Sequence, residues 1–217
     1  MIEELNNQGV IKDSKVVEEL KDEKKWFEKF RWLKTSNDFL LVCGKDAAQN
    51  EIVIKKVAEP NDLIFHASVS GSPFGVLKNG LDAKDIDRFE AANFVLCFSR
   101  AWRESIVSDV FAVKTEQVSK SAPSGEYVSH GSFVINGHKE FFNNLKLELA
   151  ISVSEGKVIA GGVELIRSRC EKYCVLHPGG IAPGKVAKRL MELFGSENLT
   201  SENYLAFIPG DSLIELP

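Results

Sequence analysis

The stretch that decides the fold is 98–142, FSRAWRESIVSDVFAVKTEQVSKSAPSGEYVSHGSFVINGHKEFF, in the middle of the chain. A helix is expected to end within 99–103. Apolar residues in both alternating registers of 107–114 predict a strand that is buried on both faces. Residues 120–127 then break the pattern with Lys, Ser, Pro and Gly, which are typical of a loop. The stretch therefore predicts either a binding loop held by rigid elements or an ordinary surface loop.

A second signal in this stretch is Asn136-Gly137, which stands between the apolar segments 133–135 and 141–142. Both central positions of a two-residue hairpin turn favour a positive φ, which Asn and Gly tolerate. We therefore expect these two segments to pair as a hairpin directly after the polar loop.

The composition is that of a globular protein without a membrane segment. Of the 217 residues, 44% are hydrophobic and 27% are charged, and no apolar run approaches the length that spans a bilayer. The N-terminus shows no secretory signal, so we expect a cytoplasmic chain. Cys43 and Cys97 lie in apolar runs, and Cys170 and Cys174 lack a companion pair for zinc. We expect reduced thiols, and neither a metal nor a cofactor.

The formal charge of −4 is unevenly distributed along the chain. Residues 1–23 carry seven acidic and three basic side chains, so the remainder is close to neutral. The overall charge therefore argues against nucleic acid as a partner, and only local basic clusters could attract one, because the overall field is weak.

The N-terminal part predicts an extension followed by one domain. Residues 1–13 show little periodicity, whereas apolar residues from 14 to 33 fall on a helical stripe that places Trp26, Phe27 and Phe30 in the core. We expect residues 1–23 to be a flexible, acidic, helical extension and residues 24–217 to form the domain.

The remaining pattern predicts an α+β fold, with helices packed on a mixed, largely antiparallel sheet, preceded by the N-terminal amphipathic helix. Asp46 and Asp82 are expected to cap two of the helices. The expected helices are 46–57, 82–103 and 183–194, and the further expected strands are 39–43, 62–67, 145–153, 157–165, 172–176 (stopped by 178–180) and 204–210.

Several short motifs, in this order along the chain, resemble the NFACT-R domain. They are KWFEKFRW at 25–32, Gly44-Lys45-Asp46-Ala47-x-x-Asn50, His66-Ala67, Gly71-Ser72-Pro73, Ser99-x-Ala101-Trp102, QVSKxAPxGEY at 117–127 and Gly131-Ser132-Phe133. This domain is the C-terminal half of ribosome quality-control proteins that elongate stalled nascent chains without a messenger. The family usually has an acidic residue after His66-Ala67, where this chain has Ser68, so a role that needs a carboxylate there is in doubt.

The resemblance implies an RNA-binding module of a quality-control factor that rescues stalled nascent chains. Its implied partners are tRNA, the large ribosomal subunit and other NFACT-family domains in the same or a partner chain, with no membrane. A free-standing RNA-binding protein that acts in tRNA modification is the alternative. An enzyme built on Asp46, Asn50, His66 and Lys120 is a third hypothesis. The sequence shows no paired base and nucleophile, so we expect no catalytic residues.

The expected RNA-binding residues come from the matched motifs and from the basic clusters beside them. The residue patterns alone also allow Asp46 to be a helix cap and His66 to be a core histidine. We expect the start of the Asp46 helix, the turn 71–74 and the loop 120–127 to lie on one side of the domain. The full set is Asp46, Asn50, Lys55, Lys56, His66, Ser72, Arg100, Trp102, Arg103, Lys114, Lys120 and Tyr127.

Overall fold

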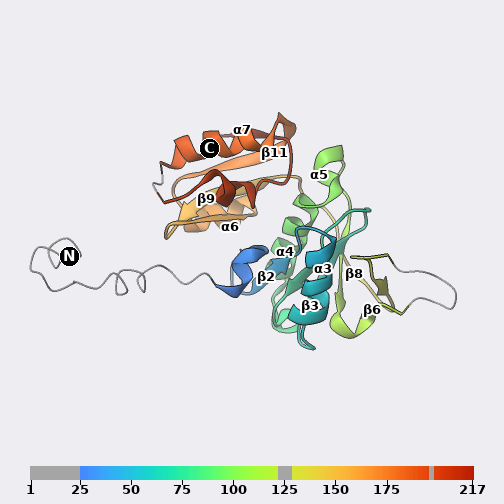
Figure 1. The fold of residues 1–217 in the computed structure, drawn as a ribbon. Helices are drawn as coiled ribbons and strands as arrows, with labels where there is room; N and C mark the ends of the chain where they lie inside the picture. Colours follow the sequence, from blue (N-terminus) through green and yellow to red (C-terminus); the bar gives the residue numbers. More distant parts are fainter. Residues whose placement is uncertain (1–24, 122–128, 196–197) are drawn as a thin grey trace, which may run out of the picture.

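The computed structural model describes residues 25–121, 129–195 and 198–217, and its largest element is an antiparallel six-stranded sheet (Figure 1). The strand order is β1-β2-β4-β3-β5-β8. The strands are β1 (Arg31–Lys34), β2 (Leu40–Cys43), β3 (Leu63–Ala67), β4 (Gly75–Leu77), β5 (Val110–Lys114) and β8 (Glu140–Phe142).

The two faces of this sheet bury alternate residues of each strand, as the two-residue period of a strand requires. In β3, Leu63 and Phe65 pack with the helix α4 (Asp85–Cys97), whereas Ile64 packs on the opposite face. That opposite face is covered by the 3-10 turn η1 (Trp26–Lys29) and by α3 (Ala47–Ile52), which continues as the π-helical turn η2 (Val53–Val57). His66 therefore points to the α3 side of the sheet.

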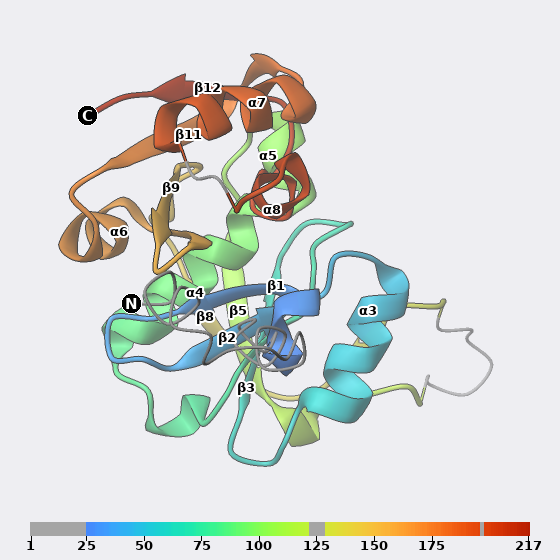
Figure 2. The same cartoon turned by 60° about the vertical axis from the view of Figure 1, so that its left-hand side comes forward.

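A second antiparallel sheet of four strands, in the order β10-β9-β11-β12, follows in the C-terminal part (Figures 1 and 2). The longest helix of this C-terminal part is α7. It begins with Pro183, whose fixed φ suits a first helical position, and it is capped at its C-terminus by Gly195, which has a φ of 60°. The elements are β9 (Leu149–Ser154), β10 (Lys157–Gly161), α6 (Val163–Arg169), β11 (Tyr173–Ile181), α7 (Pro183–Phe194), α8 (Ser201–Leu205) and β12 (Ser212–Glu215).

One hydrophobic core joins the two sheets. It contains Leu33 and Leu41 from the first sheet together with Leu149 and Ile151 from the second. In α5 (Arg100–Glu104), Trp102 is 1% exposed, and its Nε1 donates a hydrogen bond to the carbonyl oxygen of Asp211 at 3.1 Å. This ring connects the middle of the chain to its C-terminal end. No described helix is long and apolar enough to cross a membrane.

The predicted α+β class and largely antiparallel pairing are confirmed, but the helix expected through residue 33 is wrong. Residues 26–29 form only the turn η1, and Arg31 pairs with Cys43 in the antiparallel ladder of β1 and β2. The pairing with β2 supplies hydrogen bonds that a local apolar stripe cannot reveal. Phe27 and Phe30 are buried as expected, whereas Trp26 is 51% exposed. Residues 1–23, expected to be an acidic extension, lie outside the described residues.

The hairpin expected at Asn136-Gly137 is also wrong, because the chain bends at Gly137 but does not turn back on itself. Gly137 has a φ of 80°, and Gln117 Nε2 donates to the carbonyl oxygens of Asn136 and His138 at 2.8 and 2.7 Å. The flanking strands part: β7 (Val134–Ile135) pairs with β6 (Val118–Ser119), whereas β8 pairs with β5. Both strands therefore run antiparallel to residues 110–119, and Asn136-Gly137 forms a bend between them instead of the turn of a hairpin.

The helix expected at 82–103 is interrupted. Asp82 belongs to the short turn η3 (Gly80–Asp82), and α4 starts three residues later, with the Lys84 backbone N–H donating to Asp87 Oδ2 at 3.1 Å. The helix is interrupted at Ser99, whose Oγ accepts a hydrogen bond from the Ala101 backbone N–H and caps α5. A polar side chain that binds the backbone thus starts a new helix here.

Three expectations for the C-terminal part need correction. Residues 163–169 form α6 where the strand 157–165 was expected to continue. The strand β11 does not stop at Pro178 but runs through a bulge to Ile181, which is possible because its pairing with β9 ends at Leu176. The last strand is 212–215, and 201–205 is helical. The helix expected at 183–194 is confirmed.

Candidate nucleic-acid interface

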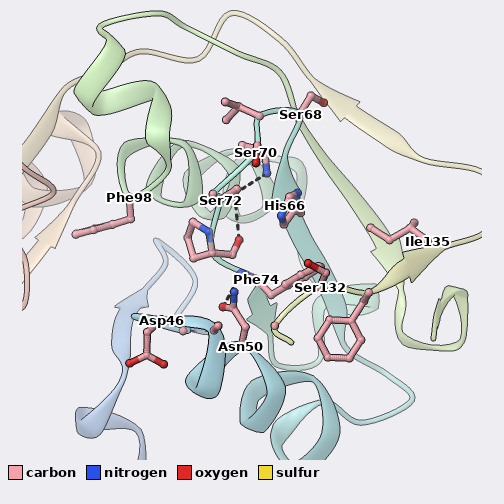
Figure 3. Close-up of a pocket in the computed structure, with 18 of the residues that line it drawn as sticks. Asp46, Asn50, His66, Ser68, Ser70, Ser72, Phe74, Phe98, Ser132 and Ile135 are labelled. Atoms are coloured by element: carbon pink, nitrogen blue, oxygen red, sulfur yellow. Dashed lines mark hydrogen bonds between the residues drawn. The ribbon is translucent and has the colours of Figure 1, made fainter. Parts of the chain in front are cut away.

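A cavity of about 680 Å³ opens on the α3 side of the six-stranded sheet. Its walls are residues 44–47 with Asn50, the turn 66–74, and the segment 130–133 (Figure 3). Two of the three motifs expected on one side of the domain, the start of the Asp46 helix and the turn 71–74, therefore share one cavity.

The start of α3 is fixed by Asp46, as expected. The Asp46 backbone is extended, and its Oδ1 accepts a hydrogen bond from the Gln49 backbone N–H at 2.8 Å. One turn later, Asn50 is 9% exposed, and its Oδ1 accepts from the Phe74 backbone N–H at 3.1 Å. Gly44 allows this approach, because a Cβ at this position would collide with the side chain and backbone of Asn50.

The turn between β3 and β4 is held by its own polar groups. Ser72 is buried, and its Oγ accepts from the Ala67 backbone at 3.0 Å and donates to the Pro73 carbonyl oxygen at 3.1 Å. Gly71 supplies the positive φ, 77°, that the reversal requires. Ser72 therefore shapes the cavity wall from within, whereas Ser68 and Ser70 are exposed at its rim.

Aromatic rings line the cavity. The centroid of His66 lies 4.5 Å from that of Phe74 and 5.8 Å from that of Phe111, and Phe133 meets Phe74 edge-on at 5.3 Å. Burial lowers the pKa of His66 to about 4, and hydrogen bonds to the backbone of Ala67 and Ser72 offset part of this effect. His66 is thus a neutral ring at physiological pH. His66 therefore packs against core aromatic residues, as a core histidine would, and at the same time lines the cavity.

Three cationic side chains and one carboxylate line the cavity. The Arg31 guanidinium lies 4.7 Å from the centroid of Phe98, and the Lys139 ammonium lies 4.4 Å from that of Phe111. Burial lowers the pKa of Arg31. Lys45 is an exposed residue whose pKa is lowered by partial desolvation of its ammonium group and by the nearby charge of Arg31. The carboxylate, Asp46, is engaged in capping α3. The lining therefore carries a surplus of positive charge over an aromatic surface.

Glu51, behind the cavity wall, ties the segment after the polar loop to α3. It forms ion pairs with Lys120 and, at 2.6 Å, with Lys55, and it accepts from the Gly131 backbone N–H at 3.0 Å. These partners, led by the Lys120 hydrogen bond, lower the Glu51 pKa to about 2. A Cβ on Gly131 would lie 2.6 Å from Ala47 Cβ, so the two segments are in close contact.

The structure distributes the other expected RNA-binding residues over several places. Lys120 lies beside the cavity, with its ammonium 4.5 Å from the Phe133 centroid. Lys56, Lys114 and Arg103 are exposed outside the cavity lining, and Arg100 pairs with Glu104 at 2.6 Å. Trp102 is a core residue that does not reach the surface, because its ring and its N–H are both satisfied inside. Tyr127 and most of the loop 120–127 lie outside the described residues.

Sequence reasoning did not identify Arg31, Lys45, Phe133 and Lys139 as site residues. Arg31 and Phe133 stand inside matched motifs, but Arg31 was assigned to a helix and Phe133 to a hairpin. Lys139 carries no local signal, since only the pairing of β8 with β5 brings it beside Phe111.

Comparisons with known proteins identify the family of the chain. Residues 29–137 match the family described as the NFACT protein RNA binding domain. The archaeal Rqc2 homolog aRqcH of Methanocaldococcus jannaschii is 38% identical over 198 residues, which are 88% of this chain and 29% of that protein. The ribosome quality control complex subunit NEMF of Homo sapiens is 41% identical over 118 residues, 54% of this chain and 11% of NEMF.

Among solved structures, the C-terminal part of the fibronectin/fibrinogen-binding protein from Streptococcus suis matches with a TM-score of 0.45 and 25% identity, covering 64% of this chain and 52% of that one. The chain spans less than a third of the length of the curated relatives that it matches.

Proposed function

Because the chain belongs to the family of NFACT protein RNA-binding domains, we propose that it is the RNA-binding module of a ribosome quality-control factor that rescues stalled nascent chains. The observation that carries this proposal is the family match over residues 29–137, together with relatives named as ribosome quality-control subunits and Rqc2 homologs. The proposed RNA partners are tRNA and the large ribosomal subunit.

The chemistry of the cavity supports RNA over other polyanions. Protein contacts to RNA combine cations for phosphates with aromatic rings for unpaired bases. The lining offers both, with Arg31, Lys45 and Lys139 around the rings of His66 and Phe133. The formal charge of −4 means that this local cluster, and not the overall field, has to supply the attraction.

The proposed role is that of one module among several. Since the chain spans a small part of its relatives, other NFACT-family domains in the same or a partner chain would complete the grip on the ribosome. The family match and the relatives give no support to the alternative role in tRNA modification.

We further propose that the module performs no catalysis. Asp46 caps a helix, Asn50 binds the Phe74 backbone, Lys120 pairs with Glu51, and His66 is neutral between aromatic rings. Each of these groups has a role in the structure, and none forms a pair of base and nucleophile. Turnover of a peptidyl-tRNA, an ester or a nucleotide that is lost in His66→Ala would contradict this.

The test of the proposed function is cosedimentation of the chain with purified large and small ribosomal subunits, combined with titration of labelled tRNA. We expect the chain to pellet with large subunits in preference to small ones and to bind tRNA in a salt-dependent manner. Binding to neither RNA would refute the proposal. Binding to free tRNA without any preference for large subunits would move the role away from the ribosome.

A further inference from the structure

The cavity differs from a generic basic patch in its volume and in the aromatic rings that line it. A charged surface that follows the phosphates of a duplex needs no aromatic cavity, because paired bases are stacked inside the helix. Here the rings of His66, Phe74 and Phe133 form a continuous cluster, and the cations stand at its edge. This arrangement matches a planar aromatic group with an attached anion.

We infer that the cavity holds one unstacked nucleotide of single-stranded RNA, with the base against His66 and Phe133 and the phosphates near Arg31, Lys45 and Lys139. The inference rests on the proposed RNA-binding function and specifies its ligand. A volume of about 680 Å³ lies within the range of pockets that bind small molecules the size of a nucleotide.

The cations retain donors for a phosphate. The hydrogen bond from Arg31 to the Gly44 carbonyl oxygen is long, at 3.4 Å, and the Arg31 side chain otherwise lies on the ring of Phe98. Lys139 contacts the face of Phe111, and Lys45 is exposed. Lys120, by contrast, is engaged by Glu51 and by the Ser129 carbonyl oxygen. The first three are therefore the phosphate-binding candidates.

The walls also offer groups for the edge of a base or for a ribose. The hydroxyls of Ser68, Ser70 and Ser132 lie on exposed residues around the opening (Figure 3). A neutral imidazole at His66 has one donor and one acceptor nitrogen. A phosphopeptide would use the cations but would leave the aromatic cluster without a partner, so the structure favours a nucleotide.

The test compares a ten-nucleotide single strand with a duplex of the same sequence by fluorescence anisotropy, at fixed salt. Phe133→Leu removes the ring but keeps an apolar side chain, and Lys139→Gln removes one rim charge. Lys188→Gln, on the exposed side of α7 in the other part of the molecule, is the matched control for charge. Adenosine and cytidine monophosphates serve as competitors, and inorganic phosphate and a phosphoserine peptide serve as controls.

We expect the single strand to bind more tightly than the duplex and both nucleotides to compete with it. Phe133→Leu should weaken single-strand binding about tenfold, as loss of one stacked base would. Lys139→Gln should flatten the slope of log K against log salt by roughly one unit, and Lys188→Gln should change neither quantity. Thermal unfolding of each variant verifies that it is folded.

The possible failures are distinct. If the wild-type chain binds RNA but Phe133→Leu has no effect and single strand and duplex bind equally, the nucleotide pocket is refuted and the RNA-binding function stands. If the phosphopeptide competes and the nucleotides do not, the cavity is an anion site for proteins. If the wild-type chain binds no RNA at all, both proposals fall together.

Discussion

The side-chain oxygen of Asn50 accepts a hydrogen bond from the Phe74 backbone N–H at 3.1 Å and so joins two walls of the cavity that are 24 residues apart in the chain. Asn50→Ala would leave this buried donor without a partner, which costs about 1–3 kcal/mol. We expect that loss in the free energy of unfolding, measured with urea, together with weaker binding of single-stranded RNA. Asp46→Ala is the control, because it removes only the helix cap and leaves the Phe74 contact in place. Unchanged stability of Asn50→Ala would show that the two walls are held by other contacts.

A second prediction concerns acid stability. The ion pairs with Lys120 and Lys55 lower the Glu51 pKa from 4.5 to about 2. A carboxyl group whose pKa is lower in the folded state stabilises the fold above pH 4.5, and this contribution is lost as the pH falls from 4.5 towards 2. Glu51→Gln should therefore be less stable than the wild type at pH 7, and its stability should fall less between pH 4.5 and 2.

Unfolding by urea at pH 7, 4.5, 3 and 2 tests this prediction, with the exposed Glu116→Gln as a control for the change in net charge. If Glu51→Gln and the wild type lose stability in parallel over this range, the ion pairs around Glu51 do not contribute to the fold.

A third prediction concerns the salt dependence of tRNA binding. With a near-neutral domain and few phosphate contacts, the slope of log K against log salt should be shallow, on the order of −2 to −4. Arg103 is exposed, whereas Lys120 is paired with Glu51. If Arg103 contacts a phosphate, Arg103→Gln should flatten the slope by roughly one unit. The double variant with Lys120→Gln should bind more weakly still, because the Glu51 carboxylate beside the cavity then loses a cation that compensates its charge.

The measurement is a titration of labelled tRNA at several salt concentrations, with Lys188→Gln on α7 as the comparison. Equal affinities for the parent and the double variant would show that neither Arg103 nor Lys120 contributes to RNA binding. A large effect of Lys188→Gln alone on tRNA affinity would show that α7 contacts the RNA.

A fourth prediction separates the core from the site at Trp102. Because its ring is buried and its Nε1 donates to the Asp211 carbonyl oxygen, Trp102→Phe should lower the free energy of unfolding by about 1 kcal/mol while leaving RNA affinity unchanged in the folded protein. Urea unfolding and RNA titration of the same sample check both parts. Loss of RNA affinity without loss of stability would show that Trp102 contributes directly to RNA binding.

The sequence predicted elements well where local chemistry decides them. Asp46 caps α3, and Pro183 starts α7, because a cap and a proline act through their immediate neighbours. It failed where long-range pairing overrides a local pattern. Residues 26–33 carry a helical stripe, yet the ladder with β2 makes Arg31–Lys34 a strand. The segment after Asn136-Gly137 was expected to pair back locally, yet it joins β5.

The same distinction applies to the site. The motifs containing Asp46, Asn50 and His66 were recognised, because the residues of each stand close together in sequence. The cationic side chains that line the cavity were not predicted as a group. Arg31 and Lys139 are more than a hundred residues apart, and only the sheet brings both to one cavity. The side of the sheet that each residue faces follows from strand register, which no short motif encodes.

The shared core of the two sheets has a consequence for how this chain can be divided. The family match ends at residue 137, but Trp102 binds the Asp211 carbonyl, and Trp32 meets Phe207 edge-on at 5.9 Å. A fragment cut at the family boundary would expose these rings and lose their partners in the C-terminal part. The part of the chain that the family match covers therefore depends for its packing on residues beyond residue 137, and a substitution at Phe207 would disturb it from outside that match.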